Sequence, residues 1–280
     1  MPLHASLLED RSVIALKGAE TRDFLQGLIT NDMTQCVPGK AMYAALLTPQ
    51  GKILFDFFIV ERDGGFLLDC AASRANDLLK RLTLYRLRAK IEISSAAGFA
   101  AAAVWSDDGF IPAFDGPWTY ADPRLPALGL RAIGPRAELQ KALSGIPSGD
   151  YALHRLLLGV PDSADLPPDT VLALDSGLEE LHGVSFKKGC YVGQEVTARM
   201  KHRATARKRF VIAETEGAVP PPGTVLDAQG REIGALATGA DSQALALVRL
   251  DRLAEIAQAG AEISAAGKKT VLRKPDWLAV

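Results

Sequence analysis

The hydrophobic positions of this chain follow two spacings that alternate along the sequence. Short apolar runs bounded by turn-forming residues predict strands, and these runs cover residues 12–18, 41–47, 52–61, 66–70, 90–94 and 98–105. Apolar residues three and four positions apart predict helices, and this spacing covers residues 20–32, 73–90, 134–143 and 150–160. We expect Ser73 to cap the second helix. Because strands and helices are interspersed without regular βαβ units, the pattern predicts an α+β fold.

Two stretches depart from this texture. Residues 109–134 are rich in Pro, Gly and Asp, which predicts an irregular path. After Arg207 the chain consists of short apolar runs separated by turns, with an Ala-rich piece at residues 253–258. Regularly spaced short strands predict a small barrel or sandwich of about 70 residues. We therefore expect an α+β domain at residues 1–206 and a small β-domain at residues 207–280.

The composition is that of a globular protein with one cationic segment. The chain has 280 residues, 48% of them hydrophobic, and a formal net charge of −1. It can bury a substantial core, and as a whole it lacks the basic balance of a nucleic-acid binder. Between Lys187 and Arg209, however, eight Lys and Arg accompany a single acid, Glu195, so this segment carries +7 and the rest of the chain −8.

The cysteine content and the N-terminus indicate a compartment. The chain has three cysteines, Cys36, Cys70 and Cys190, and no CxxC or Cys/His ligand spacing, which argues against a disulfide framework and against a metal site made by this chain alone. The N-terminal residues lack a secretory signal, and no apolar run approaches the roughly 18 residues of a membrane span. We therefore expect a cytoplasmic protein without a membrane partner.

The segment FKKGCYVGQEVTARM, residues 186–200, concentrates the candidate chemistry. Lys187 and Lys188 lie just before Cys190, and nearby positive charge favours the reactive thiolate. Gly189 and Gly193 permit a tight turn or a close approach to a flat ligand. The alternative for Cys190 is the common one, a small buried hydrophobe.

Gln194 and Glu195 have two interpretations. Their amide and carboxylate could bind the hydrogen-bonding edge of a heterocycle, or they could cap the helix that QEVTARM begins. His182 and His202 are candidate bases for the thiol, although the spacing alone places neither of them beside Cys190.

Three segments together resemble the YgfZ family, folate-binding proteins of iron–sulfur cluster maintenance that are related to the aminomethyltransferase (T-protein) of the glycine cleavage system. KGCYVGQE at residues 188–195 resembles the signature K-G-C-[YF]-x-G-Q-E. FLQGLITND at residues 24–32 resembles F-L-Q-G-x-x-T-N-D, and LLTPQGKILFDFFIV at residues 46–60 resembles L-x-x-x-x-G-[KR]-x-x-x-D-F. The resemblance covers most of the chain and is weakest over the C-terminal part.

The resemblance implies a fold, a ligand and a function. The fold is a folate-binding α+β domain of two interlocked ferredoxin-like halves, followed by a small C-terminal β-barrel. The ligand is tetrahydrofolate, or a one-carbon-substituted or polyglutamylated folate, in a central opening. The function is that of an accessory protein that assists assembly or repair of iron–sulfur clusters in client proteins, using a reactive cysteine.

The implied partners are folate and cluster-containing clients, among them tRNA-modifying enzymes. Direct RNA binding by residues 187–209 is a weaker alternative, because the net charge of −1 does not favour it. A lone cysteine supplies too few ligands for a stable cubane, which normally takes four thiolates. A cluster shared transiently with a partner is compatible with one cysteine.

The resemblance also implies site residues. Cys190 matches the motif cysteine that is most tied to activity. The matching folate-site positions are Asn31, Asp32, Asp56, Lys188, Gly189, Tyr191, Gly193, Gln194 and Glu195. Within the basic segment, Arg199, Lys201 and Arg203 are candidates for attracting the glutamate carboxylates of folate. We expect Cys190, Asp56 and Asn31 to open onto one pterin-sized cavity.

Two departures from the relatives bear on an enzymatic function. The aminomethyltransferases read G-G-x-x-D-D where this chain reads GKILFD, so Phe55 replaces the first Asp and only Asp56 is left. One-carbon transfer needs a carboxylate beside the reactive folate nitrogens, so a folate-dependent transferase is the alternative here and not the preferred function. Asp56, in an apolar run, is either functional or salt-bridged.

The second departure concerns the pterin ring. Asp175 stands where family members carry the Glu of a P-x-E-like element that would bind this ring. Its side chain is one methylene shorter, but it could still accept a hydrogen bond from the pterin. Glu179 and Glu180 are nearby alternatives, which the pattern also explains as the polar face of a short helix.

Overall fold

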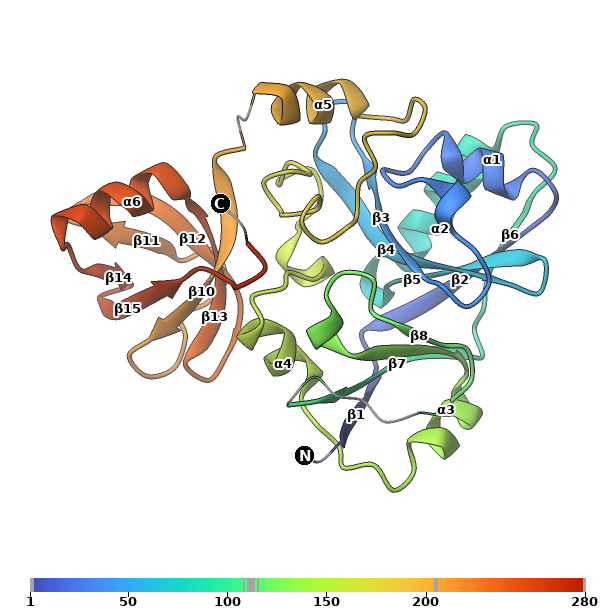
Figure 1. Ribbon diagram of the computed structural model, residues 1–280, viewed down its shortest axis with the longest axis horizontal. Helices are drawn as coiled ribbons and strands as arrows, with labels where there is room; N and C mark the ends of the chain where they lie inside the picture. The colour runs from blue at the N-terminus through green and yellow to red at the C-terminus, as the bar shows by residue number, and fades with distance from the viewer. Residues whose placement is uncertain (1–2, 108, 110–113, 115, 204–205, 279–280) are drawn as a thin grey trace.

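The computed structural model describes residues 3–107, 109, 114, 116–203 and 206–278, which form two β-sheets and a closed barrel (Figure 1). The five-stranded sheet has the order β3-β4-β5-β2-β6, the four-stranded sheet has the order β1-β7-β9-β8, and the barrel closes in the order β10-β13-β12-β11-β14-β15. The expected α+β fold with a C-terminal barrel is confirmed.

The first two strands interlock the two sheets. β1 (Leu3–Leu8) pairs with β7 (Phe99–Ser106), whereas β2 (Arg11–Lys17) lies between β5 (Gly65–Ala71) and β6 (Glu92–Ser95). Only the turn at residues 9–10 separates β1 from β2. The chain therefore passes from one sheet to the other within a single tight turn, and this turn holds the two halves together.

The five-stranded sheet is buried on both faces. The other elements of this layer are α1 (Thr21–Gln26), the 3-10 turns η1 (Met33–Gln35) and η2 (Ala72–Arg74), β3 (Met42–Leu47), β4 (Ile53–Arg62) and α2 (Ala75–Arg86). Leu25, Leu78 and Leu82 of the two helices pack on one face. Tyr43 and Phe58 on the other face pack with residues of α4 and the barrel. Burial on both faces explains the continuous apolar runs of β3 and β4.

Small side chains let helices approach the four-stranded sheet closely. The elements that come next along the chain are β8 (Thr119–Ala121), η3 (Pro126–Leu128), β9 (Leu130–Pro135), α3 (Arg136–Leu143), α4 (Tyr151–Leu157) and η4 (Ser163–Asp165). The helix α5 (Gln194–Arg203) lies instead beside the turn between β3 and β4 (Figure 1). Ala100 and Ala102 of β7 pack in one cluster with Leu139 of α3, and Ala101 and Ala103 pack in another cluster on the opposite face. Alternation along the strand thus separates the two faces.

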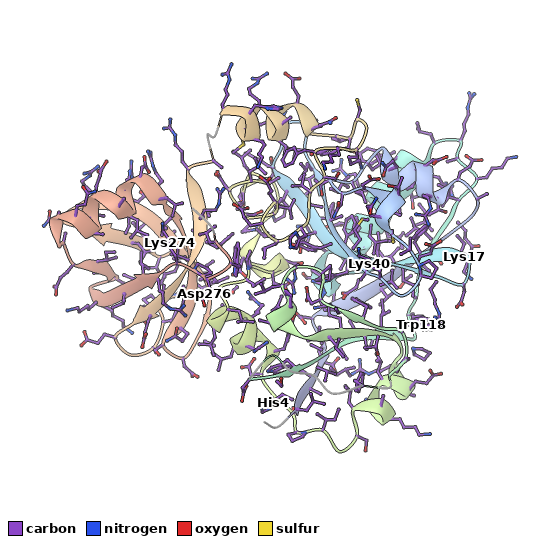
Figure 2. The ribbon with its side chains drawn as sticks, in the orientation of Figure 1. His4, Lys17, Lys40, Trp118, Lys274 and Asp276 are labelled. Atoms are coloured by element: carbon purple, nitrogen blue, oxygen red, sulfur yellow. The ribbon has the colours of Figure 1, made fainter. Side chains whose placement is uncertain are left out.

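The barrel contains a helix that packs on its core. Its elements are β10 (Lys208–Thr215), β11 (Val225–Ala228), β12 (Arg231–Ala240), β13 (Gln243–Arg249), α6 (Leu250–Ala259), β14 (Ile263–Ala265) and β15 (Lys268–Arg273). Ile256 of α6 belongs to the barrel core. Lys274 and Asp276, which follow β15, lie where the barrel meets the rest of the chain (Figure 2). The division of the chain after residue 206 stays a prediction.

Buried arginines and aspartates connect the two sheets and the barrel. The members of this network are Arg11, Asp69, Asp122, Arg124, Arg131, Arg155, Asp162 and Asp165, all of them buried. Asp69 of the five-stranded sheet accepts hydrogen bonds from Arg11 and from Arg131 of the other sheet, each at 2.6 Å. Arg155 bonds to Asp165 at 2.6 Å and to Thr238 of β12 at 2.9 Å. Because buried charges are tolerated only when they are paired, these bonds fix how the three parts meet.

Several expectations about single elements are wrong. The helix expected at residues 20–32 ends at Gln26. The helix expected at residues 73–90 spans Ala75–Arg86, and Arg74 rather than Ser73 occupies its N-cap position. β1 has no counterpart among the predicted strands. Residues 109–134, some of which lie outside the described residues, contain β8 and most of β9, because pairing with neighbouring strands outweighs the local Pro and Gly content.

Candidate functional site

Lys188 is buried and holds two loops together. Its Nζ donates to the carbonyl oxygens of Gln26 and Ile29 at 2.7 Å and to that of Asn31 at 2.8 Å. An ammonium has three donors, so all of them are used. These carbonyls belong to the last residue of α1 and to the loop that follows it. The side chain of Lys188 satisfies them where a longer helix would satisfy them internally, which agrees with the early end of α1. Burial lowers the pKa of Lys188 to about 8.

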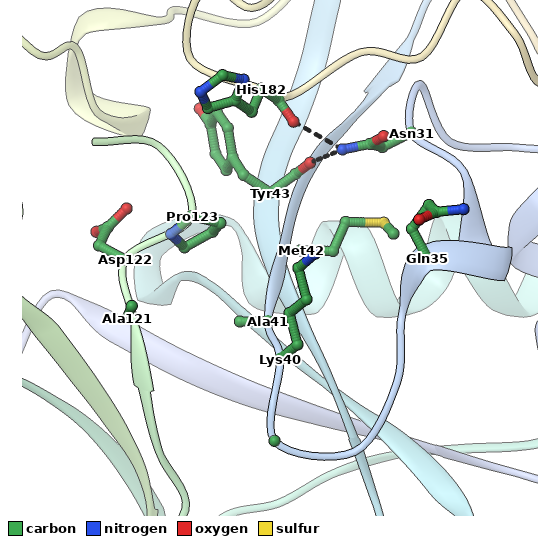
Figure 3. Close-up of a pocket in the computed structure, with 11 residues that line it drawn as sticks. Asn31, Gln35, Lys40, Ala41, Met42, Tyr43, Ala121, Asp122, Pro123 and His182 are labelled. Atoms are coloured by element: carbon green, nitrogen blue, oxygen red, sulfur yellow. Dashed lines mark hydrogen bonds between the residues drawn. The ribbon is translucent and has the colours of Figure 1, made fainter. Parts of the chain in front are cut away.

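Two other side chains close the same pair of loops. Nδ2 of Asn31 donates to the carbonyl oxygens of Tyr43 at 2.8 Å and His182 at 2.7 Å (Figure 3). Oγ1 of Thr30 donates to the carbonyl oxygen of Gly183 at 2.6 Å. Asn31, predicted to contact folate, therefore uses its amide nitrogen to join residues 26–32 to residues 182–188.

Asp32 caps the turn η1. Its Oδ1 accepts a hydrogen bond from the backbone N–H of Thr34 at 3.0 Å and another from the side chain of Gln26 at 3.0 Å. Burial works against ionisation, but these bonds outweigh it and lower the pKa of Asp32. Its carboxylate thus accepts hydrogen bonds from neighbouring residues, and its assignment to folate stays a prediction.

Cys190 differs from the other two cysteines in exposure. Cys190 is exposed, whereas Cys36 and Cys70 are buried. Burial raises the pKa of Cys36 to about 11 and that of Cys70 to about 12, so both stay protonated and inert near neutral pH. The alternative that Cys190 is a small buried hydrophobe is therefore wrong.

The residues on either side of Cys190 are anchored. Tyr191 is buried in the cluster that contains Leu47. Gly193 has a φ of +83°, and a Cβ at this position would lie 2.5 Å from the carbonyl oxygen of Thr48, so only glycine fits against the β3–β4 turn. A Cβ at Gly189 would meet nothing within 4 Å. Residues 189–190 thus form an exposed bend between buried Lys188 and buried Tyr191.

The charged side chains of α5 form surface ion pairs. Glu195, with its side chain 83% exposed, pairs with Arg199 at 2.6 Å across one helical turn. Lys201 pairs with Glu179. Gln194 is the first residue of α5, which agrees with the helix-start interpretation. Two of the candidate folate-binding cations are therefore already paired, and one of their partners lies outside the basic segment.

A cavity of about 440 Å³ opens beside Asn31 (Figure 3). Its lining residues are Asn31, Gln35, Gly39, Lys40, Ala41, Met42, Tyr43, Ala121, Asp122, Pro123 and His182. The volume lies within the range of small-molecule sites, about 300–1000 Å³. Met42, Tyr43 and Pro123 supply apolar surface, while Lys40 and His182 supply nitrogen atoms that can bind an anion or an acceptor.

Asp56 lines a separate and much smaller cavity of about 20 Å³, together with Phe55, Arg74 and Ser163 among others. The guanidinium carbon of Arg74 lies 4.7 Å from the centre of the Phe55 ring. A space of this size holds about one water molecule. Burial raises the pKa of Asp56, and the negative charge of Asp162 raises it further.

The structure does not bring Cys190, Asp56 and Asn31 together around one cavity. Of the three, Asn31 lines the 440 Å³ cavity, and Asp56 is linked to it only through Tyr43, whose hydroxyl donates to Oδ2 at 3.0 Å. Asp175 lies elsewhere and accepts a hydrogen bond at 3.2 Å from the backbone N–H of Lys208, where the barrel begins. The expected shared cavity is therefore wrong for the described residues, because the motif lysine points into the loops while the cysteine points out.

Nothing in the sequence marks most of the residues that line the cavity of about 440 Å³ as candidate site residues. Tyr43 and Met42 lie in an apolar run that predicts nothing beyond a buried strand. Asp122 and Pro123 follow β8, in the stretch for which we expect an irregular path. The pairing of β8 with β9 fixes this stretch, and the fold brings the two residues to the same cavity as Met42 and Tyr43 of β3. Asn31 and His182 are the two lining residues that the sequence marks as candidates, and His182 only as a partner for Cys190.

The comparisons with known proteins agree with this architecture. Residues 207–280 match the family model described as the CAF17 C-terminal β-barrel domain. A solved structure of the glycine cleavage system aminomethyltransferase T from Bartonella henselae superposes with a TM-score of 0.74 at 18% identity, covering 98% of this chain and 85% of that one. At this identity the match shows the fold.

Two relatives carry the same name. The mitochondrial iron–sulfur cluster assembly factor IBA57 of Homo sapiens is 31% identical over 96% of this chain and 84% of its own length. The IBA57 homolog of Mycosarcoma maydis, also named mitochondrial, is 33% identical over 78% of this chain. The aligned part spans only 59% of the length of the fungal protein.

The relatives' names contradict the expectation of a cytoplasmic protein, since they place the named proteins in mitochondria. The expectation was wrong because a low cysteine count indicates reducing conditions and not a compartment. It also considered a secretory signal, whereas a mitochondrial transit peptide has a different, Arg- and Ser-rich composition. Among the described helices, none has the length and apolar character needed to cross a bilayer.

We predict that Asp56→Asn stabilises the protein increasingly as the pH rises. The folded state raises the pKa of this carboxyl, so wild-type stability falls as the pH rises above the unfolded value. The loss is about 1.4 kcal/mol for every tenfold decrease in the acid dissociation constant on folding. The variant removes this loss. Thermal unfolding midpoints from pH 4 to pH 8 should diverge in favour of the variant.

Asp69→Asn is the matched control on the neighbouring strand. Burial opposes ionisation of Asp69, but Arg11 and Arg131 outweigh it and lower its pKa, so this variant should lose stability at pH 8 and lose less as the pH falls. If Asp56→Asn behaves in the same way, Asp56 is an ordinary ion-paired carboxylate and our account of it is wrong.

We predict that Lys188→Met lowers the free energy of unfolding by about 3 kcal/mol, because it leaves one buried and two partly buried carbonyl oxygens without this donor. The control is Lys187→Met, one residue earlier and exposed, which should change it by less than about 0.5 kcal/mol. Urea denaturation measures both. A Lys188→Met protein of wild-type stability would show that this lysine does not hold the loops.

Proposed function

Because the chain belongs to the family of iron–sulfur cluster assembly factors named IBA57, we propose that it assists the assembly or repair of iron–sulfur clusters in client proteins, and that Cys190 is the residue through which it acts. The observation that carries this proposal is the exposure of Cys190, in contrast to Cys36 and Cys70, whose thiols are buried. The clients include cluster-containing enzymes such as those that modify tRNA.

The local structure suits a thiol that meets a partner. Lys188 and Tyr191 anchor the chain on both sides of the bend, so the sulfur is held at a defined place on the surface. One thiolate supplies one of the four ligands that a cubane normally takes. In this proposal the remaining ligands come from the client or from a small thiol, and Cys190 holds the cluster, as cargo, only during transfer.

We propose that the same protein binds tetrahydrofolate or a one-carbon-substituted or polyglutamylated form of it. The cavity of about 440 Å³ is the place that fits, since it has apolar walls at Met42, Tyr43 and Pro123. The nitrogen atoms of Lys40 and His182 suit the carboxylates of the glutamate tail. The space of about 20 Å³ beside Asp56 does not fit a pterin.

An aminomethyltransferase is the less favoured function. The carboxylate that would assist proton movement at folate, Asp56, is buried and faces a space for about one water molecule. The adjacent position carries Phe55, which packs against Arg74. We also propose the division into residues 1–206 and residues 207–280, which the extent of the matched barrel family supports.

We predict that Cys190→Ser keeps the fold and abolishes cluster assembly. In cells that lack this protein, the variant should restore less than about a tenth of the activity that the wild type restores to a [4Fe–4S] enzyme, because serine is a poor cluster ligand. Cys70→Ser, at a buried cysteine, is the matched control and should restore the activity in proportion to its folded amount.

Thiol titration provides a second measurement on the purified protein. A thiol reagent should label one cysteine quickly in the native protein and all three after denaturation. Full restoration of the [4Fe–4S] enzyme by Cys190→Ser would reject the thiol as the acting group and would leave the family membership intact.

We predict that tetrahydrofolate stabilises the protein against heat. A ligand at a hundredfold excess over its Kd adds about 2.7 kcal/mol if it binds only the folded state. Gln35→Trp places a large ring in the cavity from an exposed position and should abolish the shift. Thr34→Trp, at the exposed neighbour outside the lining, should retain it. No shift at millimolar ligand would reject folate binding, and a shift that survives Gln35→Trp would place the folate elsewhere.

A further inference from the structure

The outer face of α2 exposes leucines that the described chain leaves uncovered. Leu79, Lys80, Thr83, Leu84 and Leu87 line a hollow of about 480 Å³, and we call these five residues the α2 patch. The relative exposure is 68% at Leu84 and 86% at Leu87. The opposite face of the same helix buries Leu78 and Leu82 in the core. Leu79 is partly buried and packs against that core, so the leucine side chains that the described chain leaves uncovered are those of Leu84 and Leu87.

Leu87 is held in a backbone conformation that leucine rarely adopts. It occupies the C-cap position of α2 with φ +49° and ψ −108°. Glycine is the common choice at helix ends that require a positive φ, because it has no Cβ to clash. A leucine here costs the free protein backbone strain and presents its side chain to water. The strain and the exposure would both be offset if a partner covered Leu87.

The patch is surrounded by positive charge. From residue 77 to residue 92 the chain carries five cations, Lys80, Arg81, Arg86, Arg88 and Lys90, and two acids at the ends of this stretch, Asp77 and Glu92, which leaves a net charge of +3. Within the described part of the chain, none of these five cations forms a salt bridge. A partner that covers the leucines therefore meets a net positive charge, which attracts acidic groups.

We propose that the α2 patch is the docking site for an acidic segment of a partner protein, an amphipathic helix whose apolar side chains enter the hollow while its carboxylates meet the basic rim. A helix that lays its apolar face into a groove is a common mode of peptide recognition. The leucines supply the affinity and the cations select the partner.

Other occupants fit less well. A second copy of this chain, related by a two-fold axis, would set the basic rim against itself. A nucleic acid would use the cations but leave the leucines and their hollow unexplained. An anionic membrane would meet the cations, but a bilayer surface does not need a hollow for one or two side chains. The proposal uses neither Cys190 nor the folate cavity, so it does not rest on the function proposed above.

The strained leucine gives a variant that separates docking from folding. Leu87→Gly removes the exposed side chain and relieves the positive φ, so it should leave the thermal midpoint unchanged or raise it. The same variant should weaken docking. A leucine that served only the fold would lose stability on this substitution. Val271→Ser is the control, at an apolar side chain of the barrel that is 59% exposed.

The binding probe is a synthetic helix of about 18 residues with leucines at helical spacing and glutamates elsewhere. Fluorescence anisotropy should show saturable binding to the full chain that weakens with salt. Leu84→Ser and Leu87→Gly should each weaken it about tenfold, as the loss of one buried leucine implies. Lys80→Glu combined with Arg88→Glu should do the same, and Val271→Ser should not. A peptide with lysine in place of glutamate should not bind.

A photo-crosslinking residue in place of Leu84 carries the test into cells. The proposal requires a crosslink to a protein through an acidic segment with apolar side chains, and Lys80→Glu with Arg88→Glu should abolish it. The proposal is overturned if the glutamate peptide does not bind at millimolar concentration. It is also overturned if the crosslinks go to lipid, to RNA or to a second copy of this chain. The same holds if a photo-crosslinking residue in place of Val271, the control, gives as many protein crosslinks as the one in place of Leu84.

Discussion

Three guanidinium groups surround one fully buried phenyl ring, that of Phe58. Their carbons lie 4.1 Å (Arg131), 4.8 Å (Arg124) and 5.6 Å (Arg11) from the centre of the Phe58 ring. They come from both sheets and from the segment between β8 and η3, and aspartates hold each of them. Burying one of these charges without its partners would cost several kcal/mol, so the segments that supply them have to assemble together.

The same network of charges also bears on the raised pKa of Asp56. Two aspartates, Asp56 and Asp162, lie close enough to influence each other. Burial works against the ionisation of Asp162, but Arg11 and Arg124 outweigh it and hold its pKa far below the usual range. Asp56 is left with the weaker compensation, and its pKa is raised. Burial and the charge of Asp162 keep this carboxyl from ionising, although Arg11 works against them. The space beside it holds about one water molecule, so Asp56 is a poor candidate for a base that acts on a folate.

Features that depend on neighbours in sequence could be predicted, and features that depend on distant residues could not. The apolar runs of β3 and β4 and the short strands after Arg207 predict the sheet and the barrel, because a strand's pattern reflects which of its faces are covered. The end of α1 at Gln26 depends on Lys188, which lies 162 positions away in the chain. Likewise, the sequence shows Asp69 as a single acidic residue within a predicted strand, and only the fold shows that Arg131 lies beside it.

The same distinction separates the roles within the KGCYVGQE motif. The motif contains residues that face inward, Lys188 and Tyr191, and one exposed thiol, that of Cys190. The sequence suggests Lys188 as a cation that activates the thiol, yet its three hydrogen bonds direct it into the loop behind. The sulfur is exposed on a stretch that is anchored at both ends, and Cys190 is not among the residues that line the cavity of about 440 Å³. In the function that we propose, the chemistry of this thiol therefore belongs to an encounter between two proteins, and the interior of the domain serves to hold the thiol in position.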